Sequence, residues 1–240
     1  MKQLPLFPEQ ASSIAWKVDG LYFYLIAVSL FFACLIFALT IIFTIKFHRK
    51  DDQETGVDIH GNIILEILWS VIPLGISLTM FALATYVYFA NARPPAGAQE
   101  MYVVGKQWMW KLQHPEGKRE INELHVPVGQ AVKLTMTSED VIHSFYVPAF
   151  RVKMDVLPGR YSHLWFQPTK PGKYHLFCAE YCGTNHSKMT GTVTVMEPAH
   201  YQAWLEGKTP GASAESMVSR GEKLFKQLNC LSCHGDVSRG

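Results

Sequence analysis

The sequence predicts a membrane-anchored all-β protein, in which two membrane-spanning helices precede a β-rich domain. Two long apolar stretches fill much of the first 90 residues. After residue 100 the chain changes to short runs in which apolar and polar residues alternate, with turn residues between them. Four of the five cysteines fall in two close pairs, which indicates cofactor chemistry or disulfide bonds. The net charge of +2 says almost nothing about partners, and we expect no nucleic acid among them.

The first predicted span covers residues 21–45, which carry no charge. A helix needs about 20 apolar residues to cross a bilayer, so this stretch is long enough. Residues 1–20 contain no apolar stretch of their own and no obvious small-residue cleavage site. We therefore expect a retained span rather than a signal peptide.

The second predicted span covers residues 63–90 and contains one charge, Glu66. Pro73 lies inside it, which membrane helices tolerate better than soluble helices do. A Pro-Pro pair at 94–95 ends it, because proline cannot continue a helix. The N-terminal segment and the helical hairpin together are expected to occupy residues 1–95.

Basic residues orient the hairpin. Lys46, Arg49 and Lys50 follow the first span directly, and positively charged loops stay in the cytoplasm. Both termini and everything from residue 94 onward then lie on the periplasmic side of a bacterial cell membrane.

Glu66 has two interpretations from composition alone. A carboxylate three residues into an apolar span is costly and often marks a proton or ion path. It would also lie at a helix N-terminus, where the dipole and headgroup water could keep it ionised without any function. Both interpretations stay open at this point.

The β-rich domain is predicted over residues 96–200. Val132, Leu134 and Met136 alternate with polar neighbours, which is typical of a half-buried strand. Pro-Gly pairs at 158–159 and 171–172 mark turns between strands. Several short strands at this spacing favour a sandwich or barrel of about 100 residues. Further strands are predicted at 101–112, 161–167, 173–177 and 191–196.

A cluster of soft metal ligands lies late in this domain. Cys178, Cys182, His186 and Met189 fall within one short segment, and His143 stands at an earlier strand end. Thiolate, thioether and imidazole ligands select copper or zinc over hard cations. A single-copper electron-transfer site uses two His, one Cys and a weak axial Met. Here the set has one extra Cys, whose natural use is to bridge two copper ions.

Three other interpretations of this cluster stay open from the residues alone. The two thiols could form a disulfide in an oxidising compartment, which would leave the other ligands without purpose. A structural Cys2His2 zinc site does not need Met189. The histidines could also be ordinary surface residues, as we assume for His163 and His175.

The C-terminal residues Cys230, Cys233 and His234 match a c-type haem attachment pattern. An amphipathic stretch at 219–229 precedes them, and together they resemble the first helix of a class I cytochrome c. We expect a linker at 201–218 and the start of a cytochrome c domain, truncated, at 219–240. Few residues follow His234, so the gene is expected to continue past Gly240 to supply the remaining haem pocket. Chance or a redox dithiol is the alternative.

Residues 15–200 closely resemble subunit II of haem–copper cytochrome c oxidase. The resemblance rests on three segments: His143-Ser-Phe, Pro158-Gly159-Arg160, and Cys178 to Met189. The helical hairpin and residues 107–110 also fit this family. It implies a cupredoxin-like Greek-key β-barrel that holds the dinuclear copper centre CuA.

The resemblance also implies a role for each ligand. It pairs two bridging thiolates, two imidazoles that each bind one copper, and two weak axial ligands: Cys178 with Cys182, His143 with His186, and Met189 with the backbone carbonyl of Glu180. The Glu180 side chain is the candidate ligand for a magnesium ion shared with subunit I.

Three residues outside the ligand set receive expectations as well. Trp108 and Trp110 lie two apart on a predicted strand and would share one face, where both could be core. The resemblance makes Trp108 the place where electrons enter and leaves Trp110 as packing. It makes Glu66 the entry of a proton path into subunit I.

The implied function is electron transfer from cytochrome c, or from a fused haem c domain, through CuA to subunit I, where oxygen reduction is coupled to proton pumping. Other oxidase subunits and membrane lipid are the further expected partners. A nitrous oxide reductase-like domain is an alternative, against which the hairpin argues. A quinol oxidase subunit II would lack the ligand set. A copper chaperone or storage protein would need neither Trp108 nor Glu66.

Overall fold

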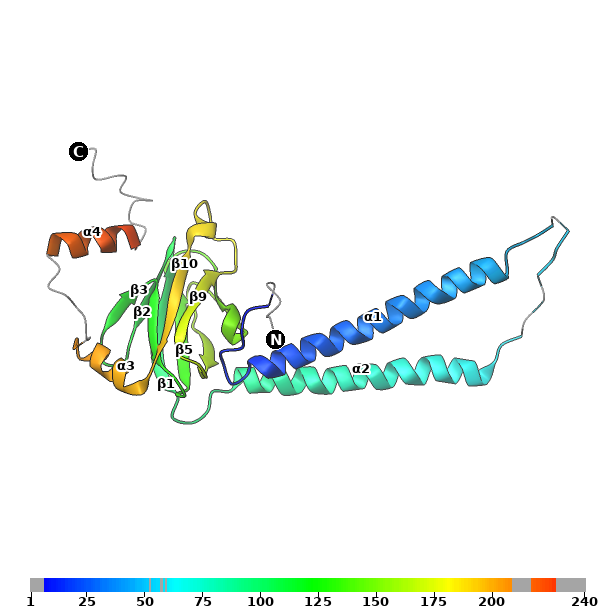
Figure 1. Cartoon of the computed structure of the whole chain (residues 1–240), viewed down its shortest axis with the longest axis horizontal. Helices are drawn as coiled ribbons and strands as arrows, with labels where there is room; N and C mark the ends of the chain where they lie inside the picture. The colour runs from blue at the N-terminus through cyan, green and yellow to red at the C-terminus, as the bar shows by residue number, and fades with distance from the viewer. Residues whose placement is uncertain (1–6, 52, 57, 59, 209–216, 228–240) are drawn as a thin grey trace. The chain divides into compact units, whose positions relative to one another are not determined.

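The computed structural model describes residues 7–208 and 217–227, apart from 52, 57 and 59 (Figure 1). The chain divides into two compact units, a helical hairpin at 16–89 and a β unit formed by 1–15 together with 90–240. The predicted haem-attachment residues Cys230, Cys233 and His234 lie outside the described residues.

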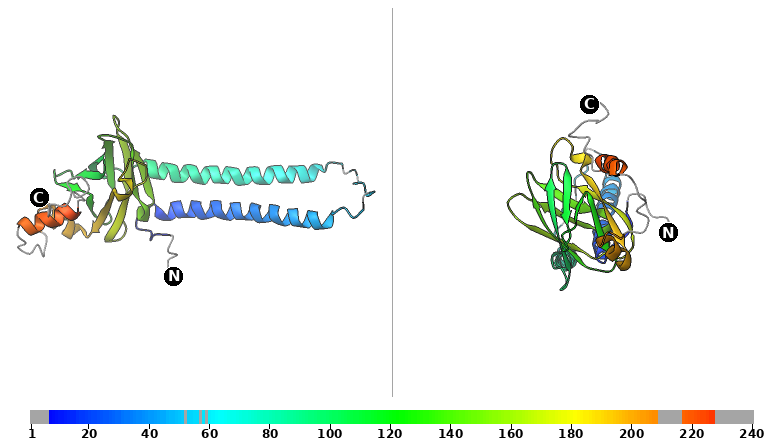
Figure 2. Two further views of the ribbon diagram at one scale, coloured as in Figure 1. Left: turned by 90° about the horizontal axis from the view of Figure 1, so that it is seen from above. Right: turned by 90° about the vertical axis from the view of Figure 1, so that its left-hand side faces the viewer.

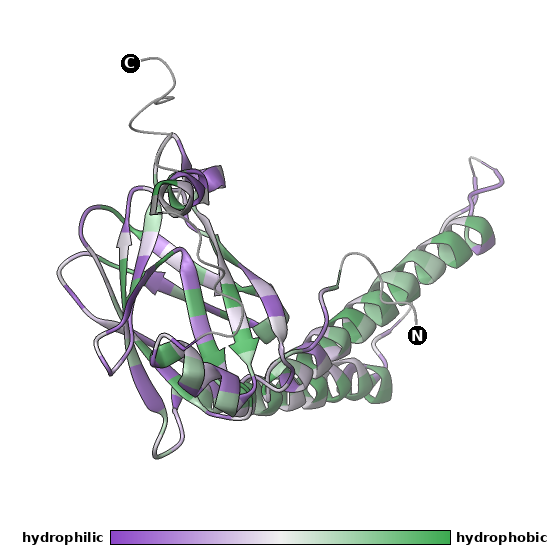
Figure 3. Cartoon of the chain, turned by 60° about the vertical axis from the view of Figure 1, so that its left-hand side comes forward, coloured by the Kyte–Doolittle hydropathy of each residue, from purple (hydrophilic) through white to green (hydrophobic). Residues whose placement is uncertain are grey.

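The hairpin consists of α1 (Ala15–Lys46) and α2 (Ile63–Ala92), which lie side by side (Figure 2). Both are long and apolar enough to cross a membrane, and hydrophobic residues, green in Figure 3, predominate along both helices. The hydroxyls of Tyr24 and Thr79 lie 2.5 Å apart and join the two helices. Asn62 caps α2 by accepting hydrogen bonds from the next turn, which places Glu66 in the first turn of the helix.

The β unit is a sandwich of two five-stranded sheets, which confirms the predicted fold. The first sheet has the order β3-β2-β1-β5-β8: Arg119–Ile121, Met109–Gln113, Gln99–Lys106, Val132–Ser138 and Ser162–Phe166. The second has the order β4-β10-β9-β6-β7: Glu123–Pro127, Thr190–Met196, Gly172–Cys178, His143–Val147 and Val152–Val156. Pairs β1·β5 and β4·β10 are parallel, and the other pairs are antiparallel.

The core lies between the sheets and is built by alternation along the strands. In β5 every second residue is buried, as the sequence pattern predicts. The largest wholly buried apolar side chains include Trp110, Phe145, Phe150 and Phe166. The apolar residues that alternate along the strands thus form the inner face of each sheet.

The predicted strand at 101–112 is wrong in one respect. Two strands, β1 and β2, occupy this stretch, and the chain reverses between them at Gln107 and Trp108. Trp108 therefore lies in a turn, whereas Trp110 lies in β2 and is wholly buried. The two indoles do not share one face of a strand, because Trp108 is part of the turn and only Trp110 is part of a strand.

The residues before α1 form a strap along the β unit. The Ala11 amide donates to the Ala149 carbonyl, and the Thr169 amide donates to the Ala11 carbonyl, both at 2.9 Å. The Ser12 hydroxyl donates to the Phe150 carbonyl at 2.8 Å. Ala11 is completely buried. We refer to residues 7–14 as the N-terminal strap.

Two short helices follow the sandwich within the described residues. Helix α3 (Pro198–Leu205) packs on β4 and extends into the stretch expected to be linker. Proline at its start suits a first helical turn, and Tyr201 is buried against the sheet. Helix α4 (Met217–Gln227) occupies the stretch predicted to be amphipathic.

Candidate metal centre

The candidate ligands come from neighbouring strand ends of the second sheet. His143 begins β6 and Cys178 ends β9, and these strands pair antiparallel, with Phe145 opposite Cys178. The start of one strand therefore lies beside the end of the other. A short 3-10 turn, His186–Lys188, returns the chain so that Met189 precedes β10.

Two sulfur atoms form the middle of the centre. The Sγ atoms of Cys178 and Cys182 lie 3.7 Å apart, and both cysteines are free and buried. This separation is far longer than a disulfide bond, so Cys178 and Cys182 are not joined by a disulfide in this structure. It leaves both sulfurs available as ligands on one short loop.

An imidazole lies beside each sulfur. His143 Nδ1 is 3.9 Å from Cys178 Sγ, and His186 Nδ1 is 3.5 Å from Cys182 Sγ. The ligand atoms of His143 and the two cysteines all lie within 4.8 Å of one another, and His186 does not belong to this close group of described residues. The donors therefore extend along the line of the two sulfurs instead of surrounding one point.

Two weaker donors complete the set. Met189 Sδ lies 3.8 Å from Cys182 Sγ, and the Glu180 carbonyl oxygen lies 3.3 Å from Cys178 Sγ. Met189 is almost completely buried, whereas the side chain of Glu180 is exposed. The structure thus brings together all six predicted donors, one weak donor beside each sulfur.

The protonation of the two thiols differs. Burial acts to raise the pKa of Cys178, but hydrogen bonds with His143 and with backbone groups outweigh it and lower the pKa to about 6. Burial and the neighbouring Cys178 thiolate raise the pKa of Cys182 to about 12. Thiolates are the metal-binding form of cysteine, so one ligand is already in that form near neutral pH.

A carboxylate that sequence reasoning missed holds His143 from behind. Asp140 Oδ1 lies 2.8 Å from His143 Nε2, and Asp140 also accepts the backbone amides of Gln107 and Val141. Burial acts to lower the pKa of His143, and contacts with Cys178 and Asp140 outweigh it and raise that pKa. Such an outer carboxylate fixes the ring orientation of a metal-binding histidine. The spacing of Asp140 and His143, three residues apart, was the available signal.

Family models match most of the chain. The model for cytochrome c oxidase subunit II, transmembrane domain, matches residues 1–88, and the model for the periplasmic domain of the same subunit matches residues 118–196. The chain belongs to the cytochrome c oxidase subunit II family. It is accordingly a membrane protein with two transmembrane helices and a periplasmic domain.

Known subunit II proteins are similar in sequence to this chain over most of their length. Cytochrome c oxidase subunit 2 of Alkalihalophilus pseudofirmus is 33% identical over 230 residues, which cover 91% of this chain and 67% of the relative. The subunit of Synechocystis sp. is 32% identical over 264 residues, which cover 89% and 78%. The crystal structure of the periplasmic domain of subunit II of cytochrome oxidase of Bradyrhizobium japonicum is 31% identical, covers 48% of this chain and 96% of that chain, and has a TM-score of 0.46.

Copper is the metal that subunit II of the haem–copper oxidases carries, as CuA, and the donor chemistry here fits it. Soft thiolate and thioether ligands with imidazoles suit copper. The line of donors offers two places for an ion, each beside one imidazole.

Trp108 lies against this subunit II centre. Its indole N–H donates to the Cys182 carbonyl at 3.2 Å, and the Gln107 side-chain amide donates to the same oxygen at 2.8 Å. The β1–β2 turn is therefore bound directly to a candidate ligand residue. Glu66 belongs to the helical hairpin, where it is exposed in the first turn of α2, and is not part of the centre.

Proposed function

We propose that residues 96–200 hold a dinuclear CuA centre that takes electrons from a cytochrome c and passes them to subunit I of the oxidase. The observation that carries the proposal is the pair of sulfurs 3.7 Å apart with one imidazole beside each. One ion inside a Cys2His2 shell would need all four donors close together, and His186 lies outside the close group. Two ions that share both thiolates suit the extended arrangement better.

The protein's own residues prepare this site. Cys178 and Cys182 would bridge the ions, His143 and His186 would each bind one, and Met189 with the Glu180 carbonyl would be the weak axial donors. Copper, when bound, supplies one-electron chemistry. The chain supplies a preformed donor set of which four members are buried, and a donor set held in place suits rapid electron transfer: His143, Cys178, Cys182 and Met189.

Trp108 is the proposed place of electron entry. Its indole is only partly buried, and its N–H is bound to the carbonyl of a bridging cysteine. The partly exposed indole therefore joins the surface of the domain to the backbone of a proposed ligand residue.

Two further sites belong to the same proposal. Glu66 is the proposed entry of a proton path into subunit I, since it is a carboxylate at the cytoplasmic end of an apolar helix. The exposed Glu180 side chain is the proposed protein ligand of a magnesium ion at the subunit I interface. Lipid around α1 and α2 is the proposed environment of the hairpin.

Copper content tests the central proposal. The full chain, purified in detergent and loaded with copper, should hold two copper ions and give a mixed-valence electron paramagnetic resonance signal when it carries one unpaired electron. Cys182→Ser should abolish the signal, and Cys34→Ser should leave it unchanged, because Cys34 lies in α1. One copper per chain with an ordinary blue-copper spectrum would overturn the dinuclear assignment.

A covalent haem c is proposed for residues 219–240, on the attachment pattern of Cys230, Cys233 and His234. The amphipathic helix α4 before it is what a cytochrome c domain would begin with. Expression together with a c-type haem maturation system should give a chain that carries haem through denaturing electrophoresis. Cys230→Ser with Cys233→Ser should remove that haem while the copper signal persists. A wild-type chain without covalent haem would contradict the proposal.

A further inference from the structure

A second cluster of metal-binding side chains lies outside the copper centre, at the corner between β3 and β4. Ligand atoms of Glu120, Glu123 and His125 all lie within 4.8 Å of one another. Glu123 and His125 are two apart on β4 and therefore lie on the same face of the strand. Asn122 turns the chain in the left-handed region, at φ 57°, and its side chain accepts the Trp110 amide at 2.8 Å. The corner is thus a fixed element of the fold.

Glu120 is held from behind. Its side chain is only 6% exposed, and its Oε1 lies 2.6 Å from Nε2 of the wholly buried His114. His114 Nδ1 in turn lies 3.0 Å from the Tyr201 hydroxyl of α3. The other carboxylate oxygen, Oε2, lies 2.5 Å from His125 Nδ1. Hydrogen-bonded support of this kind is what orients carboxylate ligands in metal sites.

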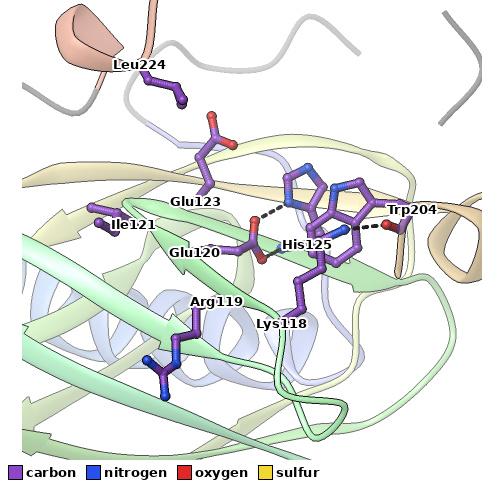
Figure 4. Close-up of a pocket in the computed structure, with 8 residues that line it drawn as sticks. All are labelled: Lys118, Arg119, Glu120, Ile121, Glu123, His125, Trp204 and Leu224. Atoms are coloured by element: carbon purple, nitrogen blue, oxygen red, sulfur yellow. Dashed lines mark hydrogen bonds and ion pairs between the residues drawn. The ribbon is translucent and has the colours of Figure 1, made fainter. Parts of the chain in front are cut away.

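The front of the cluster is open. The three residues line an open pocket of about 370 Å³. Figure 4 shows its lining side chains. The carboxylate of Glu123 is exposed and has no hydrogen-bond or ion-pair partner among the described residues. His125 Nδ1 and Glu120 Oε2 share one proton across 2.5 Å, and a divalent ion can take the place of that proton. The cluster therefore combines a carboxylate and an imidazole that face one point with the Glu123 carboxylate, which has no partner among the described residues.

The basic residues of the pocket do not block it. The Lys118 ammonium donates to the Trp204 carbonyl and lies 3.6 Å above the Trp204 ring. The same indole stacks on His125, with ring centroids 4.4 Å apart. Figure 4 shows the Arg119 guanidinium directed away from Glu123. The ammonium group of Lys118 is thus already bound by Trp204.

We infer that Glu120, Glu123 and His125 form a binding site for a divalent transition-metal ion of the zinc class. Imidazole with carboxylates suits zinc, whereas magnesium and calcium prefer oxygen ligands alone. Three protein ligands leave a position for water, as the open pocket allows. An ion there would join β3 to β4 at the place where α3 packs.

Zinc titration of the full chain in detergent tests the site. Cys178, Cys182, Cys230 and Cys233 are all replaced by Ser, so that no paired thiolates compete. Calorimetry should find a zinc site whose affinity falls by about tenfold or more in both Glu123→Gln and His125→Ala. Matched exposed controls, Glu116→Gln and His175→Ala, should bind zinc as the parent does. Excess magnesium should not compete, and cobalt should give absorption bands that the same two variants lose.

Glu123→Gln keeps the test decisive, because an exposed side chain without partners can be changed without unfolding the domain. His125→Ala removes a stacked ring and could disturb Trp204. Equal zinc affinity in Glu123→Gln and Glu116→Gln, at equal melting temperature, would overturn the inference. A chain without any zinc site that responds to either variant would overturn it as well.

Discussion

Single residues that contact the candidate ligands determine how firmly those ligands are oriented. Asp140 contacts no proposed copper position, yet it binds the far nitrogen of His143 and the amide of Gln107. It therefore connects a ligand ring to the turn that carries Trp108. Gln107 and Trp108 both bind the Cys182 carbonyl from that turn. The centre is supported on both sides by groups that the cysteine motif does not contain.

Asp140→Asn should weaken copper binding by about 10- to 100-fold, because the asparagine keeps the shape but loses the charge that holds the His143 ring. Competition with a copper chelator on the full chain measures this. Asp155→Asn is the matched control, since the Asp155 carboxylate binds Lys153 and Ser144 instead of a ligand. Equal affinity in the two variants would show that Asp140 does not orient the ligand.

Trp108→Phe should slow electron entry while the copper spectrum stays the same, because the phenyl ring loses the hydrogen bond to the Cys182 carbonyl. Stopped-flow reduction of the centre by a reduced cytochrome c gives the rate. Trp165→Phe is the control, since its buried indole N–H has no hydrogen-bond partner among the described residues. A rate unchanged in Trp108→Phe would remove this residue from the path.

The meeting of the candidate ligands could be predicted because Cys, His and Met at this spacing have few other uses; their binding of copper stays a prediction. Asp140 and Gln107 could not, because their importance depends on the close approach of the β1–β2 turn to the Cys178–Cys182 loop. A carboxylate three residues before a histidine is common in any chain. Only the fold shows that both side chains meet at one imidazole and one carbonyl.

At the scale of elements, two connections define the chemistry of the domain, the loop after β9 and the corner between β3 and β4. The strand at 101–112 was predicted as one piece because alternation continues through it, and a two-residue turn leaves no mark in that pattern. The corner was not predicted at all. Glu120 and His125 look like ordinary polar strand residues until the fold shows that they bind each other and that His114 binds Glu120. His114 is held in turn by Tyr201 of α3.

Glu120→Gln should lower the free energy of unfolding by about 1–3 kcal/mol at neutral pH, because two buried or half-buried histidines lose a charged partner. Burial acts to raise the pKa of Glu120, but hydrogen bonds with His114 and His125 outweigh it and lower the pKa. The stabilisation is therefore complete above the unfolded pKa of about 4.3 and is lost as the pH falls through the lower folded value.

Urea unfolding followed by tryptophan fluorescence, with a chelator present, measures this effect between neutral and acid pH. The difference between wild type and Glu120→Gln should shrink on acidification. Glu123→Gln, on the same corner but exposed, should stay within about 0.5 kcal/mol of wild type. A difference that does not depend on pH would assign the loss to packing instead of charge.

At the scale of the whole molecule, the chain combines a membrane hairpin with an exported redox domain. The hairpin could be predicted almost completely, because an uncharged apolar stretch has few alternatives in water. Helix α1 begins before the predicted span, since residues 15–20 continue the helix despite Lys17 and Asp19. Lys17 lies 4.9 Å from the Tyr86 ring, within the hairpin, which gives this charge a partner.

Glu66→Gln in the assembled oxidase should slow turnover, because the amide cannot pass a proton, while reduction of the copper centre keeps its rate. Oxygen consumption and stopped-flow copper reduction, measured on the same preparation, separate the two steps. Glu54→Gln, in the loop before α2, is the matched control. Turnover equal to wild type in Glu66→Gln would leave Glu66 as an anchor at the helix end.

The N-terminal strap makes folding of the domain depend on where the N-terminal tail lies. Its Ser12 binds a carbonyl 138 residues further along the chain. At about 5–20 residues per second, the ribosome needs on the order of ten seconds to produce that partner. In this interval the hairpin has to insert and the tail has to reach the side where the sandwich will fold. A molecule whose tail stays in the cytoplasm would lack the hydrogen bonds from the strap to the backbone at residues 149, 150 and 169, so the topology of the hairpin becomes a condition for completing the domain.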